Sequence, residues 1–413
     1  MRSANMLKTI LTLNAGSSSL KFSVYTLYHS SAKSELKIKF SGQVNGLGTN
    51  NLSMEIQALS EDGENFTVHE KLHSQPGCDQ YTLSLNEILH TLQSRELIPD
   101  IVGHRVVHGG NLFECAIKVN KAILQKLEEL IPLAPLHQPY NLQEIKIVEK
   151  TLPEVFQVAC FDTAFHQSIP EFRKYYALPH TLYKEGIKRY GFHGLSYQYI
   201  ASQLPEVLEA ENYRKVVVAH LGSGASLCGL IDLKSHVTTM GFTALDGLPM
   251  ATRCGQLDPG VVLYLAQHKK MTNEQIEDTL YHQSGILGLA EGYSDLASLF
   301  SSEQPKDRWV VDYYVDQIVM HITSVIGALG GIDALVFTGG VGENSPRIRR
   351  AVCAQLSWLE LKFNDDANQR HDLIISQPES HIKTLVMKTD EEKIIAEQSV
   401  KSYLETINSS TQT

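Results

Sequence analysis

The alternation of apolar and polar residues predicts β-strands along the first part of the chain. Residues Ile10–Val24 contain two apolar runs on either side of a turn of small residues, a pattern typical of a hairpin. Leu36–Val44 and Leu52–Leu59 alternate in the same way and predict further strands. At Leu83–Leu97 the apolar spacing changes to that of a helix. The chain therefore opens with strands, and a helix follows them.

Strands and helices alternate over the following residues, and the opening pattern then recurs. The predicted elements are, in order, strand Ile101–Val107, helices Ile123–Ile131 and Asn141–Glu149, strands Val155–Phe161, Val216–Leu221 and Leu227–Asp232, a strand within Gly330–Thr338, and helix Lys393–Leu404. The second pair of neighbouring strands resembles the first hairpin, because a turn rich in glycine and serine joins them. This recurrence indicates two related halves.

The length and composition narrow the class of protein. A chain of 413 residues exceeds what one hydrophobic core usually serves, so two domains are expected. The hydrophobic content of 43% and the charged content of 20% are typical of a soluble globular protein. The net charge of −10 argues against nucleic acid as the main partner, since a phosphate backbone is bound by a basic surface. Any anionic substrate must then be held by local cations.

The cysteines and the first residues bear on the cellular compartment. Six cysteines are scattered without a CxxC pair, which predicts reduced cytosolic thiols and neither disulfides nor a zinc site. No apolar run is long enough to span a membrane. Residues 1–13 resemble a signal peptide only faintly and lead directly into the turn at Asn14, so they are interpreted as a first strand. We therefore expect a cytoplasmic protein that does not bind membranes.

Three loops rich in glycine or serine follow apolar strands and are candidates for phosphate binding. They are Asn14–Ser19, His220–Ser226 and Gly339–Asn344. Glycine lets backbone N–H groups approach phosphate oxygens without a Cβ between them. No loop has the GxxxxGK[ST] order of a P-loop, and Gly222–Gly229 gives no good dinucleotide-binding fingerprint. Each loop alone also fits an ordinary turn, but together they favour a nucleotide held between two domains.

Two arginines and one histidine are candidates for contacts with the reacting groups. Arg105 lies inside an apolar strand, where a guanidinium needs either a bound anion or an internal carboxylate. Arg253 lies in a loop beside Gly255 and could equally be solvated. His193 is flanked by glycines and aromatic residues, which suits a positioned donor as well as a core histidine. His104 and His108 share one face of a strand, but no third metal ligand is near them in the sequence, so we favour a structural role.

Carboxylates occupy two further positions of interest. Asp162 ends a buried strand, and ligands of open α/β sheets bind at the carboxyl ends of strands. Glu391 and Glu392 lie near the start of the last predicted helix, where carboxylates often do no more than offset the helix dipole. Phosphoryl transfer needs phosphate-binding loops, positive charge and a carboxylate-bound Mg²⁺, and the chain contains residues for all three.

These pieces, in this order, closely resemble the acetate and propionate kinase family. The shared segments are Asn14–Phe22 (NAGSSSLKF), His104–Gly110 (HRVVHGG), Ala134–Pro139 (APLHQP), Phe161–His166 (FDTAFH), Arg189–Gly194 (RYGFHG), His220–Ser226 (HLGSGAS), Thr252–Pro259 (TRCGQLDP), Gly339–Ser345 (GGVGENS) and Thr389–Glu392 (TDEE). They cover almost the whole chain in collinear order, which makes the resemblance far more specific than any single loop.

The resemblance implies a fold and an activity. The fold is the duplicated α/β, ribonuclease H-like fold of actin-like ATPases, with two domains and an active site in the cleft between them. We place the N-terminal domain at residues 1–162 plus 390–413 and the C-terminal domain at residues 163–389. The activity is the reversible, ATP-dependent phosphorylation of acetate to acetyl phosphate and ADP, by direct in-line transfer in a homodimer. A propionate kinase, or a kinase for another short-chain acid, is the alternative.

The resemblance also implies roles for individual residues. Asn14 and Glu391 hold Mg²⁺ or Mn²⁺, Arg105 and Arg253 bracket the carboxylate and the phosphoryl group, Asp162 is the catalytic acid, and His193 stabilises the transition state. Val107, Leu136 and Phe192 form the apolar pocket for the substrate's alkyl end, next to Arg105. The residues implied to hold ATP are Lys21, His220, Leu221, Gly222, Ser223, Gly224, Asp295, Leu296, Ala297, Gly340, Val341, Gly342, Glu343 and Asn344.

Chemistry limits what Asp162 can do. A carboxylate substrate is already ionised at pH 7, because its pKa is close to that of a glutamate side chain, about 4.3. It therefore needs no general base to attack phosphorus. We expect Asp162 to orient an arginine or the metal shell and not to accept a proton.

Three positions depart from the family's pattern. Ser223 replaces the usual Asn, Ala297 replaces an Arg that lies along the adenosine, and Ala244 replaces a Pro of the apolar pocket. The first change removes an amide donor near the phosphates but leaves a hydroxyl. The second predicts looser binding of adenine and a relaxed preference between ATP and GTP. The third leaves space for an extra methylene, which is worth about 1–3 kcal/mol at most. We therefore expect propionate to be used nearly as well as acetate.

Functions from other classes of protein explain less of the sequence. A sugar kinase of the same fold would need several polar contacts where the expected pocket is apolar. A nucleotide-gated binding protein like Hsp70 or actin would not need Arg105, His193 and Arg253, and an Hsp70-like chaperone would continue well beyond Glu391. An inactive homologue is the weakest alternative, because the positions that carry chemistry are present.

Overall fold

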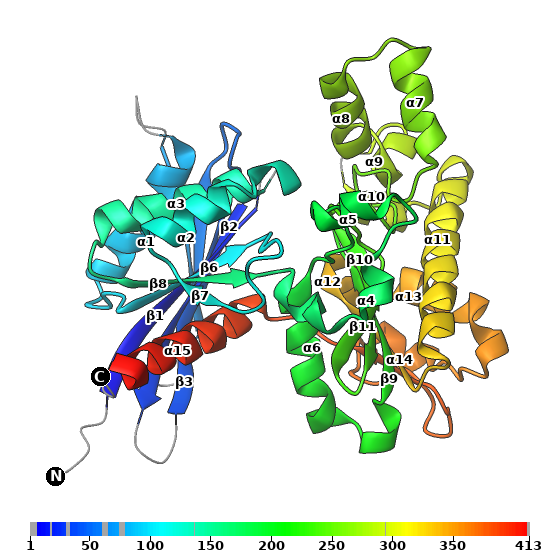
Figure 1. Cartoon of the computed structure of the whole chain (residues 1–413). Coiled ribbons are helices and arrows are strands. Elements are labelled where there is room, and N and C mark those ends of the chain that lie inside the picture. The colour runs from blue at the N-terminus through cyan, green and yellow to red at the C-terminus, as the bar shows by residue number, and fades with distance from the viewer. Residues whose placement is uncertain are drawn as a thin grey trace. The chain divides into compact units, whose positions relative to one another are not determined.

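The chain forms two compact units. The computed structural model describes residues 6–16, 19–29, 34–59, 65–73, 79–135, 137–293 and 295–410. The first unit comprises Met1–Ala164 and Asp390–Thr413, and the second comprises Phe165–Thr389 (Figure 1). No helix among the residues just named combines the length and the apolar character that crossing a membrane would require.

The first unit is built on a mixed sheet of eight strands in the order β5-β4-β3-β2-β1-β6-β8-β7. The strands are β1 Met6–Ala15, β2 Ser19–His29, β3 Ser34–Asn45, β4 Ser53–Leu59, β5 Asn65–Lys71, β6 Ile101–Val106, β7 Ile117–Lys118 and β8 Phe156–Phe161. The strands β1 to β5 form an antiparallel meander, and β6 and β8 run parallel to β1. The carboxyl ends of β1, β6 and β8 therefore meet at one edge of the sheet.

Helices cover both faces of this sheet (Figure 1). They are α1 Gln80–Gln93, α2 Lys121–Glu128, α3 Gln138–Thr151 and α15 Glu391–Ser410, with a 3₁₀ turn at Ile131–Leu133. Val106, Ala159 and Phe161 pack into an apolar cluster with Leu142 and Ile145 of α3. Successive side chains of a strand point to opposite faces, so Arg105 and Cys160 face α15, where the Cys160 thiol contacts the Ile395 carbonyl.

The second unit is built on a sheet of five strands in the order β11-β10-β9-β12-β13. The strands are β9 Lys215–Leu221, β10 Ala225–Ile231, β11 Lys234–Thr238, β12 Ala334–Thr338 and β13 Lys383–Val386. On one face, Ile200 and Leu204 of α6 (Gly194–Val207) join the core of β9 and β12. On the other face, a Cβ at Gly229 would meet Val325 of α11 (Pro305–Leu329), so this glycine allows the helix to pack closely.

The helices of the second unit include several that project from the sheet (Figure 1). They are α4 Glu171–Lys174, α5 His180–Lys184, α6 Gly194–Val207, α7 Pro259–Gln267, α8 Asn273–His282, α9 Gly285–Leu289, α10 Leu296–Ser301, α11 Pro305–Leu329, α12 Gly339–Asn344, α13 Pro346–Gln355 and α14 Asp365–Gln369. Short 3₁₀ turns lie at Ala164–Ser168, Ala210–Asn212 and Ser357–Leu359.

The two sheets share one topology. The order β3-β2-β1-β6-β8 in the first unit corresponds to β11-β10-β9-β12-β13 in the second. In both, three antiparallel strands are continued by two strands parallel to the first. The predicted recurrence of the hairpin in two related halves is therefore confirmed, and in the structure a parallel strand pairs with the first strand of each hairpin. The predicted strands and helices are also confirmed, with helix ends that differ by a few residues.

Candidate active site

The carboxyl ends of three parallel strands bring together Asn14, Arg105 and Asp162. Asn14 is the second-to-last residue of β1, Arg105 is the fifth residue of β6, and Asp162 follows β8 directly. Arg105 pairs with Cys160 across the β6–β8 ladder, so the end of β8 lies beside it. The sheet register thus places a guanidinium between a carboxylate and an amide.

Arg105 is held by hydrogen bonds on both sides. Its Nε and Nη2 donate to Asp162 Oδ2 at 3.1 and 2.6 Å, and its Nη1 donates to Asn14 Oδ1 at 3.0 Å. The side chain of Asp162 is 1% exposed and that of Arg105 is 17% exposed. The sequence left open whether an anion or an internal carboxylate meets Arg105, and the structure shows the carboxylate.

The pKa values of this ion pair follow from its burial and its charges. Burial lowers the pKa of Arg105, but the negative charges of Asp162 and Glu391 outweigh this effect and raise it above its ordinary value. Burial raises the pKa of Asp162, and the guanidinium of Arg105 opposes the rise. Because the two groups are only 2.6 Å apart, the pair is stable as a carboxylate and a guanidinium.

Asn14 also contacts the start of α15. Its Nδ2 donates to Glu391 Oε2 and to Glu392 Oε1, each at 3.0 Å. Burial and the neighbouring charge of Glu391 raise the pKa of Glu392, while the cation of Lys21 lowers it. Lys21 lies opposite Asn14 in the β1–β2 ladder and is exposed. The predicted residues of the first unit thus gather at one edge of its sheet.

The remaining predicted residues near this edge have different surroundings. Val107 is buried, and its backbone N–H donates to Asn141 Oδ1 at 3.1 Å. Leu136, predicted to contact the substrate's alkyl end, lies outside the described residues. His104 and His108 are buried, and burial lowers the pKa of each to about 4. His104 Nε2 contacts Gln157 Oε1 at 2.9 Å, which is consistent with a structural, neutral imidazole.

Glu144 is a buried carboxyl that the sequence analysis did not single out. It lies on α3, is 1% exposed, and neither of its oxygens has a hydrogen-bond partner among the described residues. Burial raises its pKa well above the ordinary value, and the charge of Arg105 opposes this shift only in part. Its helical spacing from Asn141 and Val148 matches the buried stripe of α3, so the periodicity contained a signal for its position.

We expect Glu144→Gln to stabilise the protein at alkaline pH. Because the folded state raises the pKa of Glu144, its favourable contribution is complete below the unfolded pKa of about 4.3 and is lost as the pH rises through the folded pKa. Glutamine does not titrate, so the variant should gain about 1–3 kcal/mol of unfolding free energy near pH 8 and much less near pH 5. Denaturant unfolding at both pH values measures the difference.

Glu149→Gln is the matched control, because Glu149 lies on the same helix and is exposed. Its unfolding free energy should stay within about 0.5 kcal/mol of the parent at both pH values. A gain for Glu144→Gln of equal size at both pH values would show that titration of Glu144 does not contribute.

In the second unit, His193 is fixed where α6 begins. It is the N-cap residue, with φ 58° and ψ 24°, a left-handed conformation. Its Nδ1 contacts Ser226 Oγ at 2.8 Å, and its ring stacks on His220 with centroids 4.3 Å apart. His220 Nδ1 in turn contacts Ser196 Oγ at 2.9 Å. The predicted histidines of the two loops are therefore neighbours.

Arg253 and His193 lie beside the same glycine. A Cβ on Gly224 would lie 3.3 Å from His193 Nε2 and 3.9 Å from Arg253 Nη1. Arg253 Nη1 also donates to the Ala244 carbonyl at 3.1 Å. The loop between β9 and β10 therefore brings a backbone without a side chain close to an imidazole and a guanidinium, a combination suited to an anionic oxygen.

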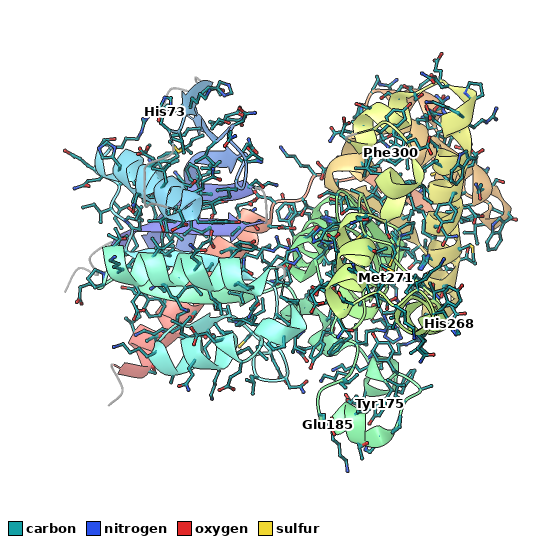
Figure 2. All side chains as sticks on the ribbon, turned by 90° about the horizontal axis from the view of Figure 1, so that it is seen from above. His73, Tyr175, Glu185, His268, Met271 and Phe300 are labelled. Atoms are coloured by element: carbon teal, nitrogen blue, oxygen red, sulfur yellow. The ribbon has the colours of Figure 1, made fainter. Side chains whose placement is uncertain are left out.

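A pocket of about 390 Å³ lies within the second unit. The residues that line it are Gly222, Ser223, Ala251, Leu287, Asp295, Leu296, Ala297, Phe300, Ser301, Gly340, Val341, Asn344 and Ser345. Eight of the fourteen residues predicted to hold ATP are in this set, whereas Lys21, His220, Leu221, Gly224, Gly342 and Glu343 are not. Phe300 of α10 is labelled in Figure 2.

Nothing in the sequence singles out Ala251, Leu287, Phe300 or Ser301, because each is an ordinary residue outside the Gly-rich segments. The fold brings them next to Gly222, Ser223 and the residues of α12. Asp295 caps α10, since its carboxylate accepts from the Ser298 N–H at 2.7 Å. The lining combines glycine backbone and small side chains with apolar residues of α10, which suits an apolar ring system next to phosphate-binding backbone.

Two charged residues support α12, the short helix that Gly339–Asn344 forms where the sequence predicted a loop. Glu343 does not line the pocket, and its Oε1 accepts from the backbone N–H groups of Gly339 and Thr389 at 2.9 and 3.2 Å. Arg349 is fully buried and donates to the carbonyls of Gly342 and Glu343 at 2.9 and 2.8 Å. Burial lowers the pKa of Arg349 to about 10. These contacts hold the helix that supplies Gly340, Val341 and Asn344 to the pocket.

The shared topology of the two units and the pocket bounded by Gly-rich loops define a protein of the actin-like ATPase fold. A propionate kinase from Francisella tularensis has a similar structure, with a TM-score of 0.85 and 32% identity, over 95% of this chain and 99% of that one. Porphyromonas gingivalis acetate kinase gives a TM-score of 0.78 at 32% identity, over 96% of this chain and 100% of that one.

The chain belongs to the Acetokinase family, which it matches over residues 9–397. Among curated relatives, the acetate kinase of Rhodopseudomonas palustris strain TIE-1 is 42% identical over 398 residues, which cover 95% of this chain and 97% of that protein. The resemblance inferred from the nine segments is thereby confirmed, and so is the α/β actin-like fold.

Proposed function

We propose that this protein is an acetate kinase, which transfers the γ-phosphoryl group of ATP reversibly to acetate. The observation that carries the proposal is Arg105, a guanidinium held by Asp162 and Asn14 at the carboxyl ends of three parallel strands. Membership of the Acetokinase family, with acetate kinases among the relatives that match nearly the whole chain, supports the same activity.

The residues of both units serve this reaction in distinct ways. Acetate is ionised at neutral pH and attacks phosphorus without a general base. Arg105 and Arg253 offset the repulsion between the carboxylate and the phosphates, and the His193 imidazole donates to the phosphoryl oxygens. Asp162 is a positioning residue, since its Oδ2 accepts two hydrogen bonds from Arg105 and no proton needs to be removed.

The acidic residues around Asn14 fit a divalent cation. Asp162, Glu391 and Glu392 provide three carboxylates against the cations of Arg105 and Lys21, and Asp162 Oδ1 is buried without a hydrogen-bond partner among the described residues. Mg²⁺ prefers oxygen ligands and commonly uses one or two carboxylates together with phosphates and water. We propose that Asn14 and Glu391 hold Mg²⁺ or Mn²⁺, which would neutralise phosphate charge when bound. Across the described part of the chain, no group of three or more His, Cys, Asp or Glu side chains is placed so that it could hold a metal by itself.

The pocket of the second unit is the proposed site for adenosine and the phosphates. Ala297 lines it with a methyl group where the family usually has an Arg, so no guanidinium from this position covers the base. Ser223 offers a hydroxyl in place of an amide. We therefore propose that GTP is accepted with a kcat/KM not far below that of ATP.

The protein is further proposed to be a cytoplasmic homodimer. Its described cysteines are free thiols, as expected for a reducing compartment. In α7, the apolar residues Val261, Leu263 and Tyr264 are 40%, 57% and 52% exposed, and no residue of this helix is buried. An apolar helix with no buried face is typical of a surface that a second copy covers.

The hydroxamate assay for acyl phosphate tests the proposed function directly. With ATP and Mg²⁺, the purified protein should form acyl hydroxamate from acetate, and no product should form without nucleotide. Absence of product with acetate, propionate and butyrate alike would overturn the proposal. Activity with a sugar and none with these acids would indicate a sugar kinase of the same fold.

The same assay measures the preference between acids. Ala244 is smaller than the proline usual in the family, so we expect the kcat/KM for propionate to lie within about tenfold of that for acetate, since one methylene contributes ~1–3 kcal/mol. Ala244→Pro should then lower propionate activity more than acetate activity. A preference of the parent for acetate of a hundredfold or more would contradict this prediction and leave the propionate kinase alternative without support.

A further inference from the structure

Two buried hydroxyl groups lie behind the His193 imidazole. The Tyr197 hydroxyl contacts Ser226 Oγ, and Ser226 Oγ contacts His193 Nδ1 at 2.8 Å. Tyr197 and Ser226 are both fully buried. Tyr197 lies one turn after His193 on α6, and Ser226 lies on β10, so helix and strand together form a chain of three polar groups.

The hydrogens available to these three polar groups decide which group donates to which. Within the part of the protein that the structure describes, Ser226 Oγ is the hydrogen-bond partner found for the Tyr197 hydroxyl, and either oxygen of the pair can donate. If Ser226 donated, the buried phenol hydrogen would be left without an acceptor there, so Tyr197 is assigned as the donor. Burial raises the pKa of Tyr197 well above its ordinary value, so the phenol keeps its proton. Once Ser226 accepts from Tyr197, its own hydrogen is available for His193 Nδ1.

We propose that Tyr197 and Ser226 are positioning residues that hold His193 in the neutral tautomer with its proton on Nε2. Tyr197 donates to Ser226, and Ser226 donates to Nδ1, which therefore acts as an acceptor. A proton on Nδ1 would place two donors against Ser226 Oγ and leave the serine hydrogen without this acceptor inside a buried site, which is unfavourable.

The consequence lies at the other edge of the ring. Nε2 is the atom of His193 nearest to Gly224, and Arg253 Nη1 borders the same glycine. The hydrogen-bonded series Tyr197–Ser226–His193, the relay, therefore places an N–H donor, and not a lone pair, where the proposed function requires hydrogen bonds to phosphoryl oxygens. Stacking of the ring on His220, which Ser196 holds at 2.9 Å, keeps the same orientation. This inference rests on the proposed phosphotransferase activity for its functional meaning but not for its structural content.

The charges around the histidine agree with a neutral ring. Arg253 is the cation beside Nε2, and a second positive charge on the imidazole would be repelled by it. Groups that face the ring from the neighbouring elements include the imidazole of His220 from β9, the hydroxyls of Ser226 and Tyr197, and Arg253 from its loop.

Histidine-selective ¹⁵N labelling and Tyr197→Phe test the relay. In the parent, the Nδ1 of His193, assigned through the missing signal of His193→Asn, should resonate as an unprotonated nitrogen near pH 7.5. In Tyr197→Phe, Ser226 loses the donor that orients its hydroxyl hydrogen toward His193 Nδ1. The Nδ1 signal should therefore move toward that of a protonated nitrogen. The variant should lose about tenfold in kcat with little change in KM for acetate, as expected when one orienting hydrogen bond is lost. Ser226→Ala should give the same nitrogen shift and a loss at least as large.

Ser235→Ala is the matched control. Ser235 is buried and its Oγ contacts a histidine Nδ1, that of His166, at the same distance of 2.8 Å, but His166 Nε2 contacts the Phe192 carbonyl and is itself buried. This variant should leave the His193 nitrogen signals and kcat unchanged within about twofold.

Two results would overturn the relay. One is a protonated Nδ1 of His193 in the parent throughout the active pH range. The other is an unchanged His193 nitrogen signal in Tyr197→Phe, whether or not kcat falls, because a purely structural role would leave the tautomer as it is. The nitrogen signals are read without substrate, so failure of the relay is distinguishable from failure of the proposed function, which the hydroxamate assay of the parent reports.

Discussion

Replacing Arg105 with Ala should lower kcat for acetyl phosphate formation by about 10³-fold. A loss of this size is typical when a guanidinium that stabilises the phosphoryl group during its transfer is removed. The reason is geometric as well as electrostatic. Asp162 and Asn14 use all three nitrogens of Arg105 to set its orientation at the end of β6. A Lys at this position keeps the charge but lacks the planar set of N–H donors of a guanidinium. The kcat of Arg105→Lys should therefore remain at least tenfold below that of the parent.

Loss of stability must be separated from loss of catalysis in this experiment. Arg105→Ala leaves Asp162 buried without its counter-charge, and breaking a buried pair in this way costs about 3–5 kcal/mol. Rates should therefore be measured well below the melting temperature of the variant. Lys8→Ala is the matched control, because the Lys8–Asp100 ion pair of 2.6 Å lies at the other end of β1. If Arg105→Ala stays within tenfold of the parent kcat while folded, the proposed role of Arg105 is wrong.

The sequence predicted the strands of this site well because their apolar runs are long and end in unusual polar residues. Arg105 and Asp162 could be selected individually, since a charged residue at the end of a buried strand is rare. Their direct hydrogen bonds could not be predicted, because 57 residues separate them and the register of β6 against β8 decides the contact. The topology of a sheet thus adds what local patterns do not contain.

Other features were missed for different reasons. The helix α11 Pro305–Leu329 has apolar residues at helical spacing, including Val311, Val315 and Ile322, so its signal was present in the sequence. Glu144 follows the buried stripe of α3, but a carboxylate is usually solvated, and only the packed structure shows that it is buried and has no hydrogen-bond partner among the residues the structure describes. Tyr197 and Ser226 have ordinary surroundings in the sequence, and they gain meaning only when α6 packs beside β10.

Asp162→Asn should lose about 10²–10³-fold in kcat at every pH at which the parent is active, as expected when a group that holds a charge stabiliser is removed. Asparagine can still accept a hydrogen bond, but it brings no charge and its amide hydrogens face a guanidinium. Arg105 then loses the carboxylate that fixes two of its nitrogens. Because the acetate nucleophile is already ionised, the variant should keep the parent's pH profile at a lower level. Recovery of Asp162→Asn toward the parent rate at high pH would instead identify Asp162 as a proton acceptor.

The double variant Arg105→Ala/Asp162→Asn decides whether the two residues act as one unit. If Asp162 works only through Arg105, removing both should cost no more in kcat than Arg105→Ala alone, and the double-mutant cycle should give a coupling nearly equal to the whole effect of Asp162→Asn. The double variant should also be more stable than Arg105→Ala, because no unpaired charge remains buried at this position. Additive losses in kcat would mean that Asp162 contacts the reacting groups or the metal shell independently of Arg105, through the Oδ1 atom that Arg105 does not use.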